Sequence, residues 1–345
     1  MTEVSLLAVS SYLPQTVVEN DFFGHGAAER RGMFTAPRER RHIGPSETAV
    51  DMIERAALAL AETLNLDRRN DIDLLFTNVA LPDQAFTGCG AEVAHRLGCR
   101  PRFIIDLHNS GCVSFVYMLE LARALLEEGS ARGALLCCAQ TAAGRVFSQP
   151  ALRNESHAPV PGDGCGVGYV AASAVSPILS IVHRCQPEFA SDMVAEAADG
   201  RRYWQPGPSP ITLKFTEQRV ASILHRGNAV VPELVGEACR AAGVSPRELD
   251  LLVTNQPNPI FLRNWREALE LPAEKHQDTF DRYGNLFGAA IPINLEEALK
   301  QGKLRPGQLA ALGGFAHAGD YAAAAILRWQ ANRSDRASAA PAISA

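Results

Sequence analysis

A six-residue segment occurs twice in this chain, in similar surroundings. Residues 73–78 read DLLFTN and residues 250–255 read DLLVTN, so that position 78 corresponds to position 255, 177 residues later in a chain of 345. Each copy is an apolar run that predicts a strand, with a predicted helix before it and a proline-containing turn and a second helix after it. Similarity at a separation of half the chain indicates an internal duplication. We therefore expect two related halves that meet at a pseudo-twofold axis.

Predicted strands and helices alternate along most of the sequence. Short apolar runs bounded by turn residues predict strands at residues 4–9, 73–79, 103–105, 134–139, 167–172, 177–182, 250–254, 309–315 and 322–329. Helical spacing predicts helices at residues 46–66 with Ser46 as cap, 89–97, 112–128, 215–242 with a break near Gly227, 260–269 and 286–301. This alternation indicates a layered α/β architecture with mostly parallel strands. We expect the halves at residues 1–174 and 175–329, irregular segments at residues 20–45 and 185–214, and a disordered tail at residues 330–345.

The segment of residues 103–129 places a cysteine at the start of a helix. An apolar run predicts the buried end of a strand at residues 103–105, and residues 106–111 supply turn and N-cap chemistry before a helix that starts at Cys112 and stops at Gly129. Apolar residues cover every face of its first three turns, which predicts a central, buried helix. Free N–H groups and the helix dipole favour a thiolate there, so Cys112 is a candidate nucleophile. The alternative is a small apolar side chain packed in a core, where free cysteines are common.

Composition argues against several other classes of protein. The net charge is −5 without a basic face, which disfavours a nucleic-acid partner. No apolar run approaches the roughly 20 residues of a membrane span, and the N-terminal residues lack the features of a signal peptide. The eight cysteines have no spacing typical of a zinc site, so we expect free thiols and no metal. These features predict a soluble cytosolic protein, with Cys137 and Cys138 in a core strand.

Four segments, in matching order, resemble motifs of the thiolase superfamily, and most closely those of 3-oxoacyl-(acyl-carrier-protein) synthase III and its acyltransferase relatives. They are the nucleophile segment at residues 106–115, with Ser114 where glycine is usual; GDGCG at residues 162–166, similar to GDGAG; NQPN at residues 255–258, similar to HQAN; and GNLFGAAIP at residues 284–292, similar to GNTSAASIP. The resemblance covers residues 1–329. It implies a duplicated α/β thiolase fold with five layers, α-β-α-β-α, usually in a homodimer.

The resemblance also implies roles for individual residues. Cys112 would attack a thioester and carry the acyl group, and Asn285 would hydrogen-bond a second thioester or the acceptor. The N–H groups of Cys112 and Gly319 would form an oxyanion hole. Phe86 resembles a residue that reaches into the acyl pocket of the partner subunit. The remaining candidates for substrate contacts are Phe287 and Arg41.

Asn255 differs from the family at a catalytic position. It replaces the catalytic histidine of HQAN; an amide can donate a hydrogen bond to an enolate oxygen but cannot accept a proton at neutral pH. The substitute base that we expect is His317, three residues before Asp320; either that carboxylate or a backbone carbonyl could orient the ring. The alternative is a histidine that fills the space left by a missing glycine. His108 and His157 are expected to be structural.

The donor implied by the resemblance is an acyl thioester of coenzyme A or of the phosphopantetheine of an acyl carrier protein, with no permanently bound cofactor. The indole that would clamp the adenine of coenzyme A has no counterpart in residues 32–44. A carrier protein is therefore favoured, with Arg38, Arg40 or Arg41 near its acidic helix or phosphate. The alternative for this basic cluster is a solvated set of charges.

Three functions are compatible with these residues. The first is an acyltransferase of specialised metabolism that loads an acyl group on Cys112 and passes it to an acceptor by condensation or by O-, N- or C-acyl transfer. The second is a catalytically reduced partner subunit of an active homologue, favoured by Asn255 and disfavoured by the presence of Cys112, Asn285 and Gly319. The third, a thiol redox protein, lacks a resolving cysteine at a suitable spacing.

Overall fold

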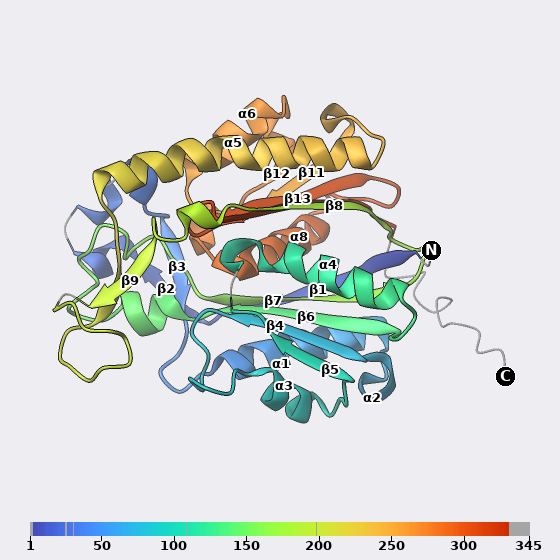
Figure 1. The fold of residues 1–345 in the computed structure, drawn as a ribbon, viewed down its shortest axis with the longest axis horizontal. Helices are drawn as coiled ribbons and strands as arrows, with labels where there is room; N and C mark the ends of the chain where they lie inside the picture. Colours follow the sequence, from blue (N-terminus) through green and yellow to red (C-terminus); the bar gives the residue numbers. More distant parts are fainter. Residues whose placement is uncertain (1–2, 25, 30, 109, 198, 331–345) are drawn as a thin grey trace.

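The computed structural model describes residues 3–24, 26–29, 31–108, 110–197 and 199–330, so nearly all of the predicted tail lies outside it. Two five-stranded sheets and their helices stack in five layers, helix, sheet, helix, sheet and helix (Figure 1). The first sheet has the order β1 (Val4–Tyr12), β7 (Gly164–Ala172), β6 (Gly133–Gln140), β4 (Leu74–Val79) and β5 (Phe103–Asp106). The second has the order β12 (His276–Gln277), β11 (Leu251–Thr254), β13 (Leu309–Ala316), β14 (Tyr321–Arg328) and β8 (Ile178–Cys185).

The two sheets repeat one strand arrangement, which confirms the duplication. In the first, β4 is parallel to β5 and β6, and β7 pairs antiparallel with β6 and β1. In the second, β11 is parallel to β12 and β13, and β14 pairs antiparallel with β13 and β8. The repeated segments form β4 and β11, at equivalent positions. The expectation of mostly parallel strands was wrong: for example, residues 317–320 between β13 and β14 are too few for the crossover that parallel strands need.

Helices fill the middle layer and cover both outer faces (Figure 1). Between the sheets lie α4 (Ser114–Glu127) and α8 (Ala290–Lys300); α1 (Ala49–Leu64) and α3 (Gly90–Leu97) cover the first sheet, and α5 (Glu217–Ala241) and α6 (Pro259–Ala268) the second. Three buried apolar clusters fill these interfaces. Within α4, Phe115 and Met118 are fully buried but Leu121 is 41% exposed. The helix is central, as predicted, but the prediction that it is buried on every face was wrong.

Shorter elements connect these layers. They are the small helices α2 (Arg68–Asp71) and α7 (Phe280–Tyr283), and the helical turns η1 (Asn20–Phe23), η2 (Ala27–Glu29), η3 (Gly32–Phe34), η4 (Gly111–Val113), η5 (Ala143–Phe147), η6 (Pro187–Phe189), η7 (Pro246–Glu248), η8 (Ala273–Lys275) and η9 (Phe287–Ala289). Both segments predicted to be irregular contain strands. In the first, β3 (Glu39–His42) pairs with β2 (Thr16–Glu19), which lies just before that segment, and the second contains the pair β9 (Val194–Ala197) and β10 (Ile211–Lys214).

Two helix predictions are corrected in detail. The cap of α1 is Thr48, not Ser46, because the Thr48 side chain accepts the Asp51 N–H while the Asp51 carboxylate accepts the Thr48 N–H. Helix α5 runs without a break through Gly227. Glycine is needed there for packing, since a Cβ would lie 2.7 Å from the Phe261 ring and 2.8 Å from the Phe315 ring.

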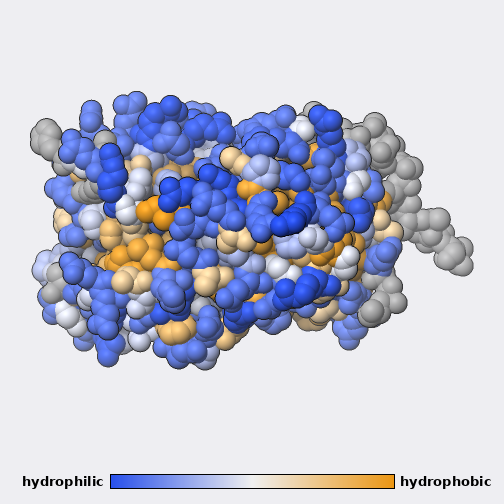
Figure 2. All heavy atoms as spheres, turned by 90° about the horizontal axis from the view of Figure 1, so that it is seen from above, coloured by the Kyte–Doolittle hydropathy of each residue, from blue (hydrophilic) through white to orange (hydrophobic). Residues whose placement is uncertain are grey.

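Strand β5 is an exposed edge and not the buried strand end that its apolar residues predicted. Phe103, Ile104 and Ile105 are 41%, 39% and 37% exposed. The face seen in Figure 2 is mostly hydrophilic, with apolar patches in a central band. No helix among the described residues is long and apolar enough to cross a bilayer.

Candidate active site

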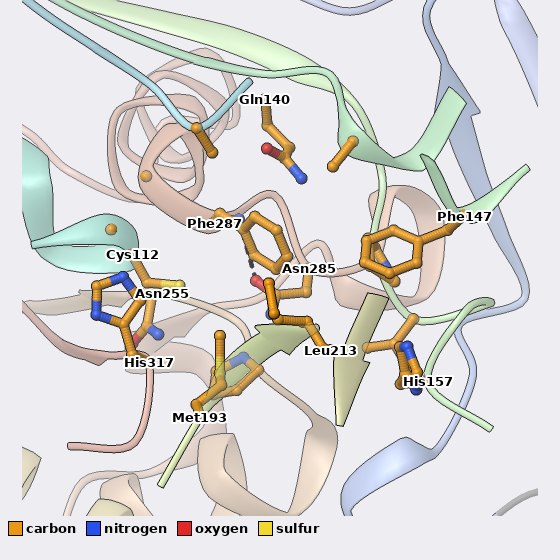
Figure 3. A pocket seen from close by; sticks show the side chains of 18 of the residues that line it. Cys112, Gln140, Phe147, His157, Met193, Leu213, Asn255, Asn285, Phe287 and His317 are labelled. Carbon is orange, nitrogen blue, oxygen red and sulfur yellow. Dashed lines mark hydrogen bonds between the residues drawn. The ribbon is translucent and has the colours of Figure 1, made fainter. Parts of the chain in front are cut away.

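A cavity of about 400 Å³ lies where loops of both halves meet. Cys112, Asn255 and His317 group at one end of it, and Phe147 and His157 lie at the other (Figure 3). Most of the lining is apolar. The polar side chains in the lining are Asn78, His108, Cys112, Gln140, His157, Thr212, Asn255, Asn258, Asn285 and His317.

Cys112 lies in the helical turn η4, immediately before the central helix α4. A tight bend presents it: Ser110 has a φ of 61° and Gly111 a φ of 32°, a conformation that side-chain-bearing residues seldom adopt. Burial raises the pKa of the Cys112 thiol to about 12, although a hydrogen bond with Asn255 opposes this shift. The predicted resting thiolate is therefore corrected to a neutral thiol, because desolvation in the middle layer outweighs the local N–H groups.

Asn255 follows the end of β11 and is fixed between the nucleophile and the last strand residues of the same sheet. Its Nδ2 donates to the Phe315 carbonyl at 2.9 Å, and its side chain also hydrogen-bonds the Cys112 sulfur. Its Oδ1 is buried and finds no partner in the part of the chain that the structure describes. Gly314 makes room for this amide, since a Cβ there would lie 2.4 Å from Oδ1.

His317 is oriented by Asp320, as predicted. Its Nδ1 lies 3.3 Å from Asp320 Oδ2, and a Cβ on Gly111 would lie 2.9 Å from its Nε2, so the second ring nitrogen faces the turn that carries Cys112. Burial opposes ionisation of Asp320, but the hydrogen bond and the charge of His317 outweigh it and lower the pKa of this carboxyl. The arrangement can hold a proton on the imidazole beside the thiol.

Asn285 and Phe287 lie between the two ends of the cavity (Figure 3). The Asn285 N–H donates to Val160 O at 2.9 Å, and its carbonyl accepts the Gly162 N–H at 3.1 Å, so the GDGCG and GNLFG segments meet here. Asn285 Oδ1 accepts the Phe287 N–H at 3.0 Å. This leaves Nδ2 as the group of Asn285 that can donate to a ligand.

Two other predicted site residues lie outside the cavity lining. The Gly319 N–H donates to Ala316 O at 2.9 Å inside a turn, so its part in an oxyanion hole with the Cys112 N–H stays a prediction. Phe86 is 101% exposed and directed away from its own subunit. Its predicted reach into a partner subunit also stays untested.

Within the basic cluster, Arg40 is not available to an anionic ligand, whereas a contact of Arg38 or Arg41 with a carrier protein stays a prediction. Arg40 is fully buried in β3, where its guanidinium donates to Val18 O at 3.0 Å and to Asn20 Oδ1 at 2.6 Å. Burial lowers the pKa of Arg40 to about 10 despite the charge of Glu39. Arg41 donates to Gln15 O at 3.1 Å. Of the three arginines, only Arg38 is exposed and makes no side-chain hydrogen bond among the described contacts; its backbone N–H donates to Asp281.

Sequence reasoning missed some residues of the cavity. His157 was expected to be structural, but its ring lines the far end, with Nε2 at 3.2 Å from Thr212 Oγ1 of the β9–β10 hairpin. His108 also lines the cavity. Gln140 was not singled out; the available signal was a polar residue directly after the apolar run of β6. No cluster of metal-ligating side chains occurs among the described residues.

Two residues of the NQPN segment, Gln256 and Asn258, make hydrogen bonds that stabilise the surrounding fold. Gln256 is fully buried; its Nε2 donates to Thr279 Oγ1 at 3.0 Å and its Oε1 accepts the Thr279 N–H at 2.7 Å. Asn258 caps α6 by accepting the N–H groups of Ile260 and Phe261. These hydrogen bonds hold the NQPN segment against Thr279 and the start of α6, and so support the position of Asn255.

Comparisons with known proteins agree with this geometry. Two family models match: 3-oxoacyl-[acyl-carrier-protein (ACP)] synthase III at residues 105–187, and the C-terminal model of the same name at residues 239–329. A β-ketoacyl-[acyl-carrier-protein] synthase III of Granulibacter bethesdensis is 30% identical over 328 residues, which cover 90% of this chain and 95% of the relative.

Solved structures show the same fold. The synthase III of Thermus thermophilus superposes with a TM-score of 0.80 at 27% identity, covering 95% of this chain and 100% of that one. The priming β-ketosynthase of the R1128 polyketide biosynthetic pathway superposes with a TM-score of 0.81 at 21% identity, covering 96% and 97%. The predicted five-layered fold is thereby confirmed.

Proposed function

Because the chain belongs to the 3-oxoacyl-[acyl-carrier-protein] synthase III family of acyltransferases, in the thiolase superfamily, we propose that it loads an acyl group on Cys112 and transfers it in specialised metabolism. One observation carries the proposal: the half-buried Cys112 opens onto an apolar cavity beside His317, which Asp320 orients. A buried thiol next to an oriented imidazole is the arrangement that nucleophilic catalysis requires.

Loading begins with the Cys112 sulfur forming a bond to the carbonyl carbon of the donor thioester. The carbon–sulfur bond of the donor breaks, the thiol proton passes to His317 Nε2, and from there it protonates the departing pantetheine thiolate. The raised pKa of Cys112 makes this assistance necessary, because almost no thiolate exists at neutral pH. Asn255 stabilises negative charge on the sulfur by its hydrogen bond.

Transfer then uses the same groups on the second substrate. The Asn255 and Asn285 amides can donate to a carbonyl or enolate oxygen of the acceptor, and His317 can take a proton from a hydroxyl or amine. Decarboxylative condensation needs the donors, whereas O- or N-acyl transfer needs the base. Both amides and the imidazole line one cavity, so we keep both reactions within the proposal.

The donor is proposed to be an acyl thioester of coenzyme A or of an acyl carrier protein, and no permanently bound cofactor takes part. We further propose a cytosolic homodimer. The apolar residues of the exposed edge strand β5 and the fully exposed Phe86 support a partner subunit on this side. The eight cysteines are all free thiols, which suits a reducing compartment.

The second candidate function is a catalytically reduced partner subunit of an active homologue. Asn255 favours it, since the residue cannot act as a base. The presence of an oriented His317–Asp320 pair beside Cys112 speaks for the first function, because a purely structural subunit has no use for such a pair.

Intact-mass spectrometry tests the proposal. The wild-type protein is mixed with a panel of acyl-CoA and acyl-carrier-protein thioesters, and we expect a mass increase of one acyl group that Cys112→Ala abolishes. Cys185→Ala is the matched control, because Cys185 is the exposed cysteine of the chain and would collect adventitious acylation. Absence of Cys112 acylation with every thioester would support the partner-subunit function instead.

A further inference from the structure

Gln140 is a buried amide without a partner in the wall of the cavity. It is the last residue of β6 and only 1% exposed. Neither Nε2 nor Oε1 has a hydrogen-bond partner among the described residues. Figure 3 shows the amide directed into the cavity, in the region of Phe287 and Phe147 and away from the end that holds Cys112.

Other buried amides of the molecule show how unusual this is. Gln256 pairs both amide atoms with Thr279, and Asn285 and Asn258 accept backbone N–H groups. Asn255, Gln277 and Asn294 each leave a single buried atom unpaired, so that Gln140 is the one amide in the described chain whose two atoms are both buried and unpaired. A buried polar group without a partner destabilises a fold, and an apolar residue of the same size would fill this wall better.

We propose that Gln140 recognises a neutral polar substituent on the acyl chain, a group such as a hydroxyl that both donates and accepts hydrogen bonds. The reason is that an amide offers one donor and one acceptor side by side, and a hydroxyl or carboxamide satisfies both. An unsubstituted alkyl chain would keep the two atoms unpaired when it fills the cavity, which disfavours its binding. This inference rests on the proposed function, since it assumes that the cavity holds the acyl group of Cys112.

The polar side chain at the far end of the cavity is not unpaired in the way that Gln140 is. His157 lies there, but its Nε2 already faces Thr212 Oγ1 at 3.2 Å. The side walls near it are apolar, among them Phe147 and Leu213. The substituent is therefore expected part way along the chain and not at its end, where Gln140 can reach it.

The test compares acyl chains that differ only in a hydroxyl. Hexanoyl and octanoyl thioesters and their 3-hydroxy and 5-hydroxy analogues are offered both on coenzyme A and on an acyl carrier protein. The second-order rate constant of Cys112 acylation is measured by intact mass. For the wild type we expect one hydroxylated isomer to load roughly 10- to 100-fold faster than its unsubstituted chain.

Two substitutions assign the preference to this side chain. Gln140→Met keeps the length of the side chain and removes the amide, and is expected to lose the preference; Gln149→Met, at an exposed position in the same region, is expected to keep it. If Gln140→Met does not fold, Gln140→Leu takes its place. The inference would be overturned if Gln140→Met kept the wild-type ratio of the loading rates for hydroxylated and unsubstituted chains. It would also be overturned if the wild type preferred unsubstituted chains, or if the substitution changed the oligomeric state and left that ratio unchanged. Failure of every thioester to acylate wild-type Cys112 would overturn the proposed function as well, which distinguishes the two.

Discussion

The ends of β6 and β13 are equivalent in the two halves, yet they carry different polar groups. Each strand lies parallel to one copy of the repeated segment, β6 beside β4 and β13 beside β11. Strand β6 ends in Gln140, whose amide has no partner among the described residues. Strand β13 is followed by His317, whose ring is held by Asp320. Both side chains line the same cavity.

The difference separates two duties of one duplicated scaffold. A group that moves protons must be oriented before the substrate arrives, and the Asp320 carboxylate does this for His317. A group that recognises a ligand keeps its hydrogen-bonding capacity for that ligand, as we propose for Gln140. On the function proposed above, duplication supplied two equivalent strand ends, and the residue at each end decides whether that end takes part in the reaction or in substrate selection.

Removing the imidazole gives the largest expected effect. His317→Ala should slow acylation of Cys112 by about 10²–10⁴-fold at neutral pH, the usual contribution of a positioned base. In this variant only the thiolate reacts. Because burial raises the pKa of Cys112 to about 12, its rate should rise roughly tenfold per pH unit between about pH 7 and 10. Stopped-flow acylation at several pH values measures both; a wild-type rate and pH profile would remove His317 from the mechanism.

Removing the orienting carboxylate should cost less. Asp320→Asn leaves the imidazole in place but free to turn, so acylation should fall by about 10²-fold, the lower end of what a positioned base contributes. The folded-state pKa of Asp320 is lowered, so its stabilising contribution is present above the unfolded value of about 3.9 and is lost as the pH falls through the folded pKa. Urea unfolding should therefore show a gap between wild type and variant at neutral pH that closes as the pH falls through the lowered folded-state pKa of Asp320. A gap that widens on acidification would contradict the assignment.

The glycine beside Asn255 should be sensitive to a single methyl group. In Gly314→Ala the new Cβ would lie 2.4 Å from Asn255 Oδ1 and 3.2 Å from Val113 Cγ1. We expect a loss of about 1–3 kcal/mol in the free energy of unfolding, together with slower acylation as Asn255 moves from the sulfur. Gly236→Ala in α5 is the control, because its nearest neighbour is 3.7 Å away; it should be neutral or slightly stabilising. Urea unfolding of both variants tests this prediction. Equal changes in the free energy of unfolding would show that Gly314 is not packed tightly against Asn255.

Local pattern was enough to predict the duplication and the start of the central helix. The DLL-x-TN copies and the Cys112 segment are contiguous, and their apolar spacing survives in the folded chain. The orientation of His317 was also readable, since Asp320 is three residues away. Properties that depend on distant residues were not. The raised pKa of Cys112 follows from burial between two sheets, and the exposure of β5 follows from its place at a sheet edge.

The residues of the cavity wall also depend on contacts between distant segments, which the sequence did not predict. His157 and Thr212 meet from segments 55 residues apart, and Thr212 lies in a hairpin that was predicted to be irregular because its strands are short and flanked by polar loops. Gln140 stands at the end of a predicted strand, but nothing in its neighbours says that no other residue will pair with it. Only the assembled fold places an unpaired amide there.

The smallest expected effect contrasts two buried glutamines. Gln140→Met should raise the free energy of unfolding by about 1 kcal/mol, because it removes a desolvated amide that pairs with nothing described in the structure. Gln256→Met should lower it by about 1–3 kcal/mol, because the buried Thr279 N–H loses its acceptor and the Thr279 hydroxyl, which still donates to Asn294, loses the donor on its oxygen. Urea unfolding of the two variants without ligand gives the signs. Destabilisation by both substitutions would mean that the Gln140 amide has a structural partner. The proposed contrast between the end of β6, which selects the substrate, and the end of β13, which takes part in the reaction, would then be wrong.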